Sequence, residues 1–296
     1  SKADLPSPNH KSITLEENPS LHADDVDYPC VLKPLNLSAS QGVIRANTQT
    51  EFVKAFERIK ALLLDNDKRT KTKILIEDYI EGEEVALEGL MVDGKLTVLA
   101  LFDKPDPLEG PYFEETIYIT PSRKSIEIQN SIRNMAEQAA NSIGLKEGPL
   151  HIELRLRPNT RTSNKTGPCV IDMAARSIGG LCSRSLRFSD GLTLEDIILH
   201  HAIGRPLQTN RENKASGVMM IPLPTAGILK RVDGTLDAKS VPGITDITIS
   251  STVGKQVIPL PDGNKYLGFI FAKADQPDAV EAALRTAHSK LNFKII

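Results

Sequence analysis

Leu150-His-Ile-Glu-Leu-Arg155 and Val170-Ile-Asp-Met-Ala-Ala-Arg-Ser-Ile-Gly-Gly180 are the two stretches that decide the fold. Both begin as apolar, strand-like runs, and each presents an acid in an alternating register, Glu153 in the first and Asp172 in the second. Arg176 follows Asp172 by four residues. Carboxylate oxygens bind hard cations such as Mg²⁺, and cationic side chains bind phosphate. Together the two stretches indicate magnesium–nucleotide chemistry.

The length and composition of the chain set broad limits. Its 296 residues are enough for about two domains of roughly 150 residues each. The 36 basic and 38 acidic residues nearly balance, whereas a dedicated nucleic-acid-binding protein usually carries a basic excess. The three cysteines lack metal-ligand spacing, so we expect reduced thiols and no disulfide framework. No apolar run approaches the ~18 residues that cross a bilayer, and no signal-like segment is evident. We therefore expect a soluble, cytoplasmic protein without nucleic-acid or membrane partners.

The first 121 residues predict short strands, one helix and a long loop. Residues 1–27 are rich in Pro, Ser, Asn and acids and are interpreted as a lead-in. A helix is expected over 49–64, where apolar residues recur at helical spacing after a capping-box pattern. Strands are expected over 28–34, 73–80, 85–92 and 95–102, the last two as a hairpin around Asp93-Gly94. Residues 103–121 are proline-rich and predict a loop, in which an ordinary turn is favoured for Asp103 and Lys104.

The rest of the chain shows two different patterns of predicted secondary structure, one before and one after about residue 215. Helices are expected over 122–143 and 193–203, on either side of the two acid-bearing strands. From about residue 215, short strands alternate with Pro/Gly turns, at 217–223, 227–232, 246–251 and 266–273. A last helix is expected over 277–291. We interpret this final part as a separate small α+β domain.

Two segments near the N-terminus have both a functional and an ordinary interpretation. Lys33 ends an apolar strand, and the small-residue segment Ser38–Val43 after it could close over phosphates; an ordinary turn is the alternative. Glu77–Glu84 ends one strand and opens the next through a glycine, so that adenine could lie against the apolar hinge. The alternative there is an acidic surface turn.

The order of these features resembles the ATP-grasp superfamily, whose members include D-alanine–D-alanine ligase and biotin carboxylase. An apolar strand ends in Lys33-Pro34 and is followed by a small-residue loop. Three motifs come later, in this order: Glu77-x-x-Ile-x-Gly-x-Glu84, His151-x-Glu153 and Ile171-Asp-x-x-x-Arg-x-x-Gly-Gly180. The Asp172–Gly180 segment and the tail, with Gly217-Val-Met-Met-Ile-Pro222, look most like the L-amino acid ligase group. Asp172 stands where the superfamily usually has Glu, and Ala174 where many members have Asn.

This resemblance implies an α+β protein with the ATP-grasp fold of two α+β lobes and an additional small α+β C-terminal domain. We expect an N-terminally truncated small lobe over 1–82, a large lobe with the metal acids over 83–212 and the C-terminal domain over 213–296. Because a preceding N-terminal domain is expected to be missing, we expect this chain to bind nucleotide weakly and to turn over poorly.

The resemblance also implies a role for individual residues. Those expected to contact ATP are Lys33 at the phosphates, Ser38, Ser40 and Gly42 in the phosphate-covering loop, Glu77, Asp78, Tyr79 and Ile80 around adenine, and Glu84 at the ribose. Glu153 and Asp172 would hold Mg²⁺, with Mn²⁺ as an alternative, and Arg176 would act in catalysis. Those expected near the substrate are Glu115 (or Glu114), His151, Gly179 and Gly180, with simple packing an equal alternative for His151.

The activity implied is that of an ATP- and Mg²⁺-dependent carboxylate–amine ligase. It would form an amide or peptide bond through an acyl phosphate and release ADP, with small-molecule carboxylates and amines as partners. Two alternatives stay open: an ATP-grasp carboxylase of biotin or purine-pathway type, and a non-catalytic nucleotide-binding module. A homodimer is one open oligomeric state.

Overall fold

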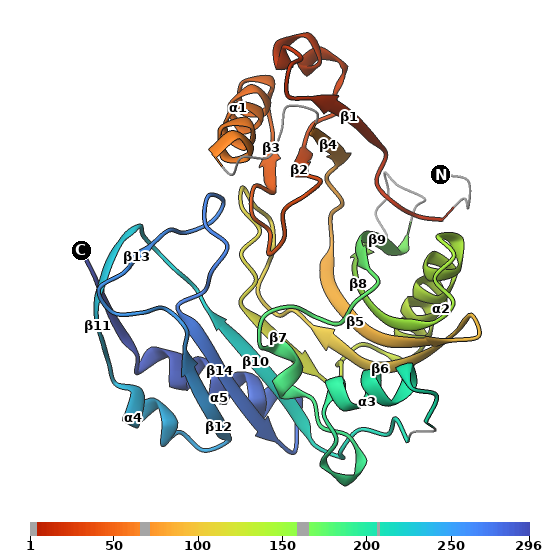
Figure 1. The fold of residues 1–296 in the computed structure, drawn as a ribbon, viewed down its shortest axis with the longest axis vertical. Helices are drawn as coiled ribbons and strands as arrows, with labels where there is room; N and C mark the ends of the chain where they lie inside the picture. The colour runs from red at the N-terminus through yellow and green to blue at the C-terminus, as the bar shows by residue number, and fades with distance from the viewer. Residues whose placement is uncertain (1–4, 66–71, 159–165, 206–207) are drawn as a thin grey trace.

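Two antiparallel sheets carry most of the fold (Figure 1). The computed structural model describes residues 5–65, 72–158, 166–205 and 208–296. The smaller sheet has, in spatial order, β1 (His10–Thr14), β4 (Lys73–Asp78), β2 (Cys30–Pro34) and β3 (Ile44–Ala46). The larger sheet has β12 (Ile244–Ile249), β14 (Gly268–Ala274), β10 (Ala215–Ile221), β7 (Ile117–Thr120), β6 (Lys95–Asp103), β5 (Glu83–Val92), β8 (Gly148–Arg157) and β9 (Gly167–Ala174).

The small sheet is covered by α1 (Gln49–Asp65), as the apolar periodicity predicts. Phe52, Phe56, Ile59 and Leu63 lie on one stripe of this helix and are fully buried against the sheet. The expected lead-in is more than a connection, because β1 pairs with β4 along its whole length. Two 3₁₀ turns, η1 (Pro19–Leu21) and η2 (Ala23–Asp25), follow β1 and contact α1. Five residues of mixed polarity gave too weak an alternation to identify β1 from the sequence.

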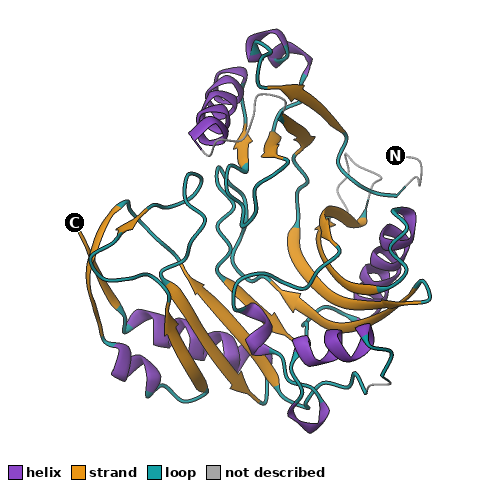
Figure 2. Cartoon of the chain, in the orientation of Figure 1, coloured by secondary structure: helices purple, strands orange, loops and turns teal. Residues whose placement is uncertain are grey.

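The large sheet buries both of its faces. On one face α2 (Ile126–Ser142) packs against Val85, Leu87 and Met91, and α5 (Pro277–Ser289) packs against β10 and β14. On the other face lie η3 (Cys182–Ser185), η4 (Ser189–Gly191) and α3 (Leu194–Ala202). Figure 2 shows α2 and α3 beside the strands of the large sheet and α1 beside the small sheet. No helix of the described ranges is both long and apolar enough to cross a bilayer.

The C-terminal segment shares the large sheet. β10 pairs with β7 from Ser216↔Thr120 to Met219↔Ile117, so the sheet continues across the expected boundary at 212/213. A separate C-terminal domain stays a prediction. The expectation that 103–121 is all loop is wrong, because β7 lies within it. A third, three-stranded sheet is made of β13 (Gln256–Val257), β11 (Gly227–Asp233) and β15 (Asn292–Ile295), and α4 (Thr235–Lys239) follows β11. The boundaries at 82/83 and 212/213 stay predictions.

Candidate functional site

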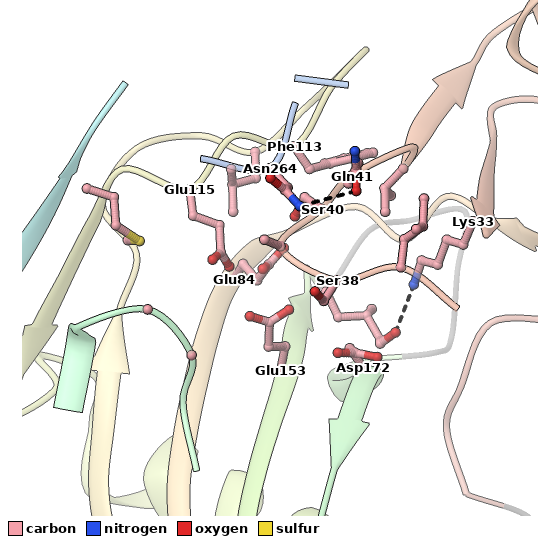
Figure 3. Close-up of a pocket in the computed structure, with 18 of the residues that line it drawn as sticks. Lys33, Ser38, Ser40, Gln41, Glu84, Phe113, Glu115, Glu153, Asp172 and Asn264 are labelled. Carbon is pink, nitrogen blue, oxygen red and sulfur yellow. Dashed lines mark hydrogen bonds between the residues drawn. The ribbon is translucent and has the colours of Figure 1, made fainter. Parts of the chain in front are cut away.

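A cavity of about 740 Å³ lies between the small sheet, the large sheet and the C-terminal segment. Every residue predicted as a site from the sequence lines it, with the exception of Gly42 and of Glu114, the alternative to Glu115. The lining residues among those predictions are Lys33, Ser38, Ser40, Glu77, Asp78, Tyr79, Ile80, Glu84, Glu115, His151, Glu153, Asp172, Arg176, Gly179 and Gly180. Figure 3 shows several of these side chains converging from different strands and loops. The fold therefore brings together residues that are up to 147 positions apart, from Lys33 to Gly180.

Glu153 and Asp172 are direct cross-strand partners on β8 and β9. Partners in an antiparallel pair project from the same face of the sheet, and Figure 3 shows both carboxylates on the cavity side. Partial burial and the neighbouring Glu153 carboxylate raise the pKa of Asp172, although Lys33 opposes the shift. The two acids thus lie close enough to repel each other, a repulsion that a bound cation would relieve.

Lys104 lies at the centre of a buried acid cluster. Its Nζ is 2.6 Å from Glu84 Oε1, 2.6 Å from Glu115 Oε1 and 2.9 Å from Glu153 Oε1, and its side chain is 3% exposed. Burial alone would lower the pKa of Lys104, but these three carboxylates raise it well above its usual range. The expectation of an ordinary turn at Lys104 is therefore wrong. A lysine after a strand gave no sign that three acids from separate strands and a loop would surround it.

Glu115 and Glu153 share this ammonium group but titrate differently. Burial raises the pKa of Glu115 to about 7, although Lys104 lowers it. Burial also disfavours the charge on Glu153, yet Lys104 and His151 hold the pKa of Glu153 well below its usual value. Tyr118, a further residue that the sequence did not single out, donates its hydroxyl to Glu115 Oε1 at 2.5 Å. Glu114, the other candidate, lies elsewhere: its carboxylate accepts the Leu223 N–H at 3.1 Å.

His151 lies between two carboxylates. Its Nδ1 is hydrogen-bonded to Glu88 Oε1, and its Nε2 is 3.6 Å from Glu153 Oε1. Burial would lower the pKa of His151, but Glu153 and Glu88 raise it to about 10, so the ring carries a positive charge. Both ring nitrogens face protein acids, and a contact between His151 and substrate stays a prediction.

The predicted adenine segment forms the wall of the cavity next to β2. Tyr79 lies under the guanidinium of Arg45, 4.0 Å from the ring centroid, and its ring stacks on Phe113 at 6.5 Å. The N–H groups of Asp78 and Tyr79 donate to Asn9 O and Pro29 O, and Ile80 O accepts from Arg155 at 2.9 Å. These three main-chain groups are therefore already engaged, which limits what they can offer an adenine. Glu84, expected at the ribose, is likewise engaged by Lys104 and by Arg155 Nε at 3.1 Å.

Lys33 connects the two sheets at the end of the cavity near Asp172. Its Nζ is 2.6 Å from Glu77 Oε2 on β4 and donates to Ile171 O on β9 at 2.9 Å. Ile171 directly precedes Asp172, so the ammonium lies beside the acidic end of β9. A cation that bridges opposing sheets at this place can contact a phosphate held between them.

The loop after Lys33 is held by the C-terminal segment. Gln41 Nε2 donates to Asp262 O at 2.6 Å, and the N–H of Gly42 donates to Pro261 O at 2.9 Å. Gly42 has φ +73° and does not line the cavity, so its observed role is to turn the loop toward this contact. Arg58 on α1 binds the Asp262 carboxylate at both oxygens, 2.9 and 2.7 Å. The loop that carries Ser38 and Ser40 is thus held by residues more than two hundred positions later in the chain.

Two cations that line the cavity, Arg176 and Lys265, form no ion pair with an acid of the described residues. Arg176 is exposed and donates to Ser177 O at 2.7 Å, and Lys265 is exposed on the C-terminal side. Within the described part of the chain, neither has a carboxylate at ion-pair distance. Each can therefore bind an anionic group of a ligand without displacing a protein acid. Lys265 was not predicted, because its segment carries no motif.

Comparisons with known proteins place this geometry in a family. The profile of the "ATP-grasp domain" matches residues 26–185, which is more than half of the chain. The chain belongs to the ATP-grasp family. The profile of the "L-amino acid ligase C-terminal domain 2" matches residues 219–295 of this ATP-grasp protein. The expected family and the α+β ATP-grasp fold are thereby confirmed.

Individual ATP-grasp relatives are ligases. Alanine–anticapsin ligase of Bacillus subtilis (strain 168) is 27% identical over 214 residues, 67% of this chain and 43% of that protein. D-alanine–D-alanine ligase of Cupriavidus pinatubonensis is 26% identical over 191 residues, 60% of this chain and 55% of that protein. The crystal structure of L-amino acid ligase from Bacillus licheniformis matches with a TM-score of 0.83 and 26% identity, covering 100% of this chain and 71% of that one. The chain thus spans about half the length of these curated relatives.

Proposed function

We propose that this chain supplies the ATP-binding and catalytic part of an ATP- and Mg²⁺-dependent carboxylate–amine ligase. The observation that carries the proposal is the cross-strand pair Glu153–Asp172 in one cavity with an unpaired arginine, Arg176, and with Lys33 on the opposing sheet. The names of the relatives agree with it, because each joins a carboxylate to an amine.

The side chains present fit a magnesium ion. Glu153 and Asp172 offer carboxylate oxygens, the ligands that Mg²⁺ prefers, and desolvation together with repulsion from Glu153 raises the pKa of Asp172. Oxygens of Glu84, Glu115 and Glu153 also lie within 4.8 Å of one another, but the Lys104 ammonium lies within 2.9 Å of all three and would compete with an ion placed among them. We therefore assign the ion to Glu153 and Asp172, and Mn²⁺ would suit the same oxygens. When bound, the ion would offset negative charge on phosphate oxygens.

The residues of the chain then have distinct tasks in the proposed reaction. Lys33 binds the phosphate end of ATP, and Ser38 and Ser40 cover it from the loop that Asp262 holds closed. The carboxylate substrate attacks the terminal phosphorus, so an acyl phosphate and ADP form. The amine then attacks the acyl carbon, phosphate leaves, and the amine loses a proton as the amide forms. Arg176 binds the oxygen on which negative charge develops, a role that requires a cation free of protein acids.

Charge also suggests which end of the cavity takes which group of an amino-acid substrate. Glu115 shares the Lys104 ammonium with Glu84 and Glu153, so this acidic end would suit a further ammonium group, whereas Lys265 and Arg176 suit carboxylate or phosphate groups. Small zwitterions are therefore the substrate class that we propose.

The test is release of phosphate from ATP by this chain, with Mg²⁺ and with pairs of amino acids as substrates. We expect release that requires both a carboxylate and an amine, and we expect Arg176→Ala to reduce turnover by about 10²–10³-fold while ADP binding changes little. Lys95→Ala, a change at a side chain 83% exposed, is the matched control. Hydrolysis that depends on bicarbonate would favour a carboxylase instead. Absence of Mg²⁺-dependent ATP binding by calorimetry would favour a non-catalytic module.

A further inference from the structure

Glu88 is a buried acid that the reaction described above does not use. It lies on β5, and its side chain is 2% exposed. Four residues after Glu84 on the same strand, it projects from the face of the sheet that carries the cavity. In the register of β5 and β8 it is the direct partner of His151. A carboxylate in such a place must be hydrogen-bonded at both oxygens to be tolerated.

One oxygen of Glu88 points toward the metal acids. Oε1 is hydrogen-bonded to Nδ1 of His151, and Nε2 of the same ring is 3.6 Å from Oε1 of Glu153. The imidazole therefore bridges Glu88 and Glu153. A carboxylate behind a histidine fixes the orientation of the ring, and so fixes what its other nitrogen faces.

The other oxygen holds the loop that carries Arg176. Oε2 of Glu88 accepts the main-chain N–H of Ile178 at 3.0 Å. Ile178 is 8% exposed and packs in the apolar cluster beneath this loop, two residues after Arg176 and directly before Gly179. The buried N–H needs an acceptor, and Glu88 is the one that the fold supplies from a strand 90 residues earlier.

We infer that Glu88 is a positioning residue that aligns the metal-binding side chain of Glu153 and the Arg176 loop from a single buried carboxylate. The inference rests on the proposed ligase function for the consequence in turnover, but its structural part stands on contacts alone. Groups that hold reacting side chains from behind typically contribute about 10–100-fold when removed. Displacing a catalytic group by about 1 Å costs on the order of 100-fold.

A purely structural role is the alternative: Glu88 could only satisfy the buried N–H of Ile178. Two substitutions separate the roles. Glu88→Gln keeps the volume and the oxygen that accepts from Ile178, but it removes the charge that orients His151. Glu88→Ala removes both contacts. Glu137→Ala is the matched control, because the Glu137 carboxylate also accepts a strand N–H, that of Leu96 at 2.8 Å, on α2 away from the cavity.

The experiment combines turnover, binding of ADP with Mg²⁺, and amide hydrogen exchange of the peptide that contains Ile178. For Glu88→Gln we expect kcat about 10-fold lower, with KM for ATP, ADP affinity and exchange near Ile178 within about twofold of the unsubstituted protein. For Glu88→Ala we expect kcat lower by 100-fold or more, with exchange near Ile178 at least 10-fold faster. Glu137→Ala should leave kcat and that exchange unchanged.

Each arm can overturn the inference separately. Unchanged kcat in Glu88→Gln means that the charge on Glu88 positions nothing, and unchanged exchange in Glu88→Ala means that Glu88 does not hold the loop. If Glu88→Ala does not fold, the Glu88→Gln arm decides. If the unsubstituted protein neither binds ATP with Mg²⁺ nor shows turnover with any amino-acid pair, the proposed function fails; exchange near Ile178 in Glu88→Ala then still decides whether Glu88 holds the loop.

Discussion

Replacing Lys104 by methionine tests how the acid cluster is held together. The change keeps most of the apolar stem but removes the ammonium group that lies within 2.9 Å of Glu84, Glu115 and Glu153. Glu84 keeps Arg155 as a partner, so Glu115 and Glu153 lose the most. The variant therefore leaves two buried carboxylates that repel each other without a lysine between them.

The size of the effect follows from burial. Removing one partner of a buried ion pair typically costs 3–5 kcal/mol, so we expect the free energy of unfolding to fall by about 4 kcal/mol at pH 8.5. Without the ammonium, the pKa of Glu115 rises further above its value in the unfolded chain, and the pKa of Glu153 also rises, although His151 still opposes that rise. The folded variant then binds protons more tightly than the unfolded chain, and its stability rises as the pH falls. At pH 5.5 we expect a loss of about 2 kcal/mol or less.

Urea titrations of the unsubstituted protein and of Lys104→Met at pH 8.5 and 5.5 measure the difference in the free energy of unfolding. Lys95→Met is the control, because Lys95 is 83% exposed and 3.7 Å from Glu137; we expect it to change stability by less than about 0.5 kcal/mol. Mg²⁺ provides a second readout, since three carboxylate oxygens within 4.8 Å become available to a cation. At a concentration of 100 times its Kd, the ion would restore about 2.7 kcal/mol. A Lys104→Met variant that loses less than about 1 kcal/mol at both pH values would refute the reasoning.

Further predictions concern stability at single positions. The pKa of His151 is about 10 in the folded protein, against 6.5 for an unperturbed histidine. In EDTA, the free energy of unfolding should therefore fall as the pH rises from 6.5 to 10, by about 1.4 kcal/mol for each pH unit. His151→Asn should flatten this pH dependence in urea titrations. Gly82→Ala should cost about 3 kcal/mol, because φ is +122° and a Cβ would lie 2.1 Å from Leu156 O; a thermal scan showing an unchanged Tm contradicts this. Phe56→Ala should cost about 4 kcal/mol in the same assay, since the ring is fully buried, and a loss below 1 kcal/mol would mean that the core collapses around it. Arg58→Gln should cost under about 1 kcal/mol in urea, because Arg58 and Asp262 are 43% and 45% exposed; a larger loss would show that their contact supports the whole small lobe.

Local signals predicted much of the fold. The helix α1 follows from one apolar stripe, and the β5–β6 hairpin follows from Asp93-Gly94, whose φ angles of 47° and 75° are those of a tight two-residue turn. The strands β1 and β7 were missed because each is short and owes its place to a distant partner. The pairing of β7 with β10 is decided by tertiary packing. The alternation of apolar and polar residues along one strand does not predict which distant strand it will pair with.

The candidate site was predictable where sequence order alone carried the information. Alternation along β8 and β9 indicated that Glu153 and Asp172 share a face, and their register agrees. The partners that surround these acids were not predictable. Lys104 and Glu88 reach the site only because β5, β6 and β8 lie next to each other, and a charged residue on an apolar strand says nothing about which distant group it will meet.

The ladder between β7 and β10 has a practical consequence for anyone who shortens this protein. Deleting the residues after 212 would strip β7 of the neighbour that pairs with Ile117 and Thr120, and would expose a row of main-chain donors and acceptors beside large apolar side chains. Such an unprotected edge recruits other chains, so the trimmed product should aggregate. We therefore expect the residues after 212, which a domain map would mark as detachable, to be needed to keep the rest of the chain monodisperse.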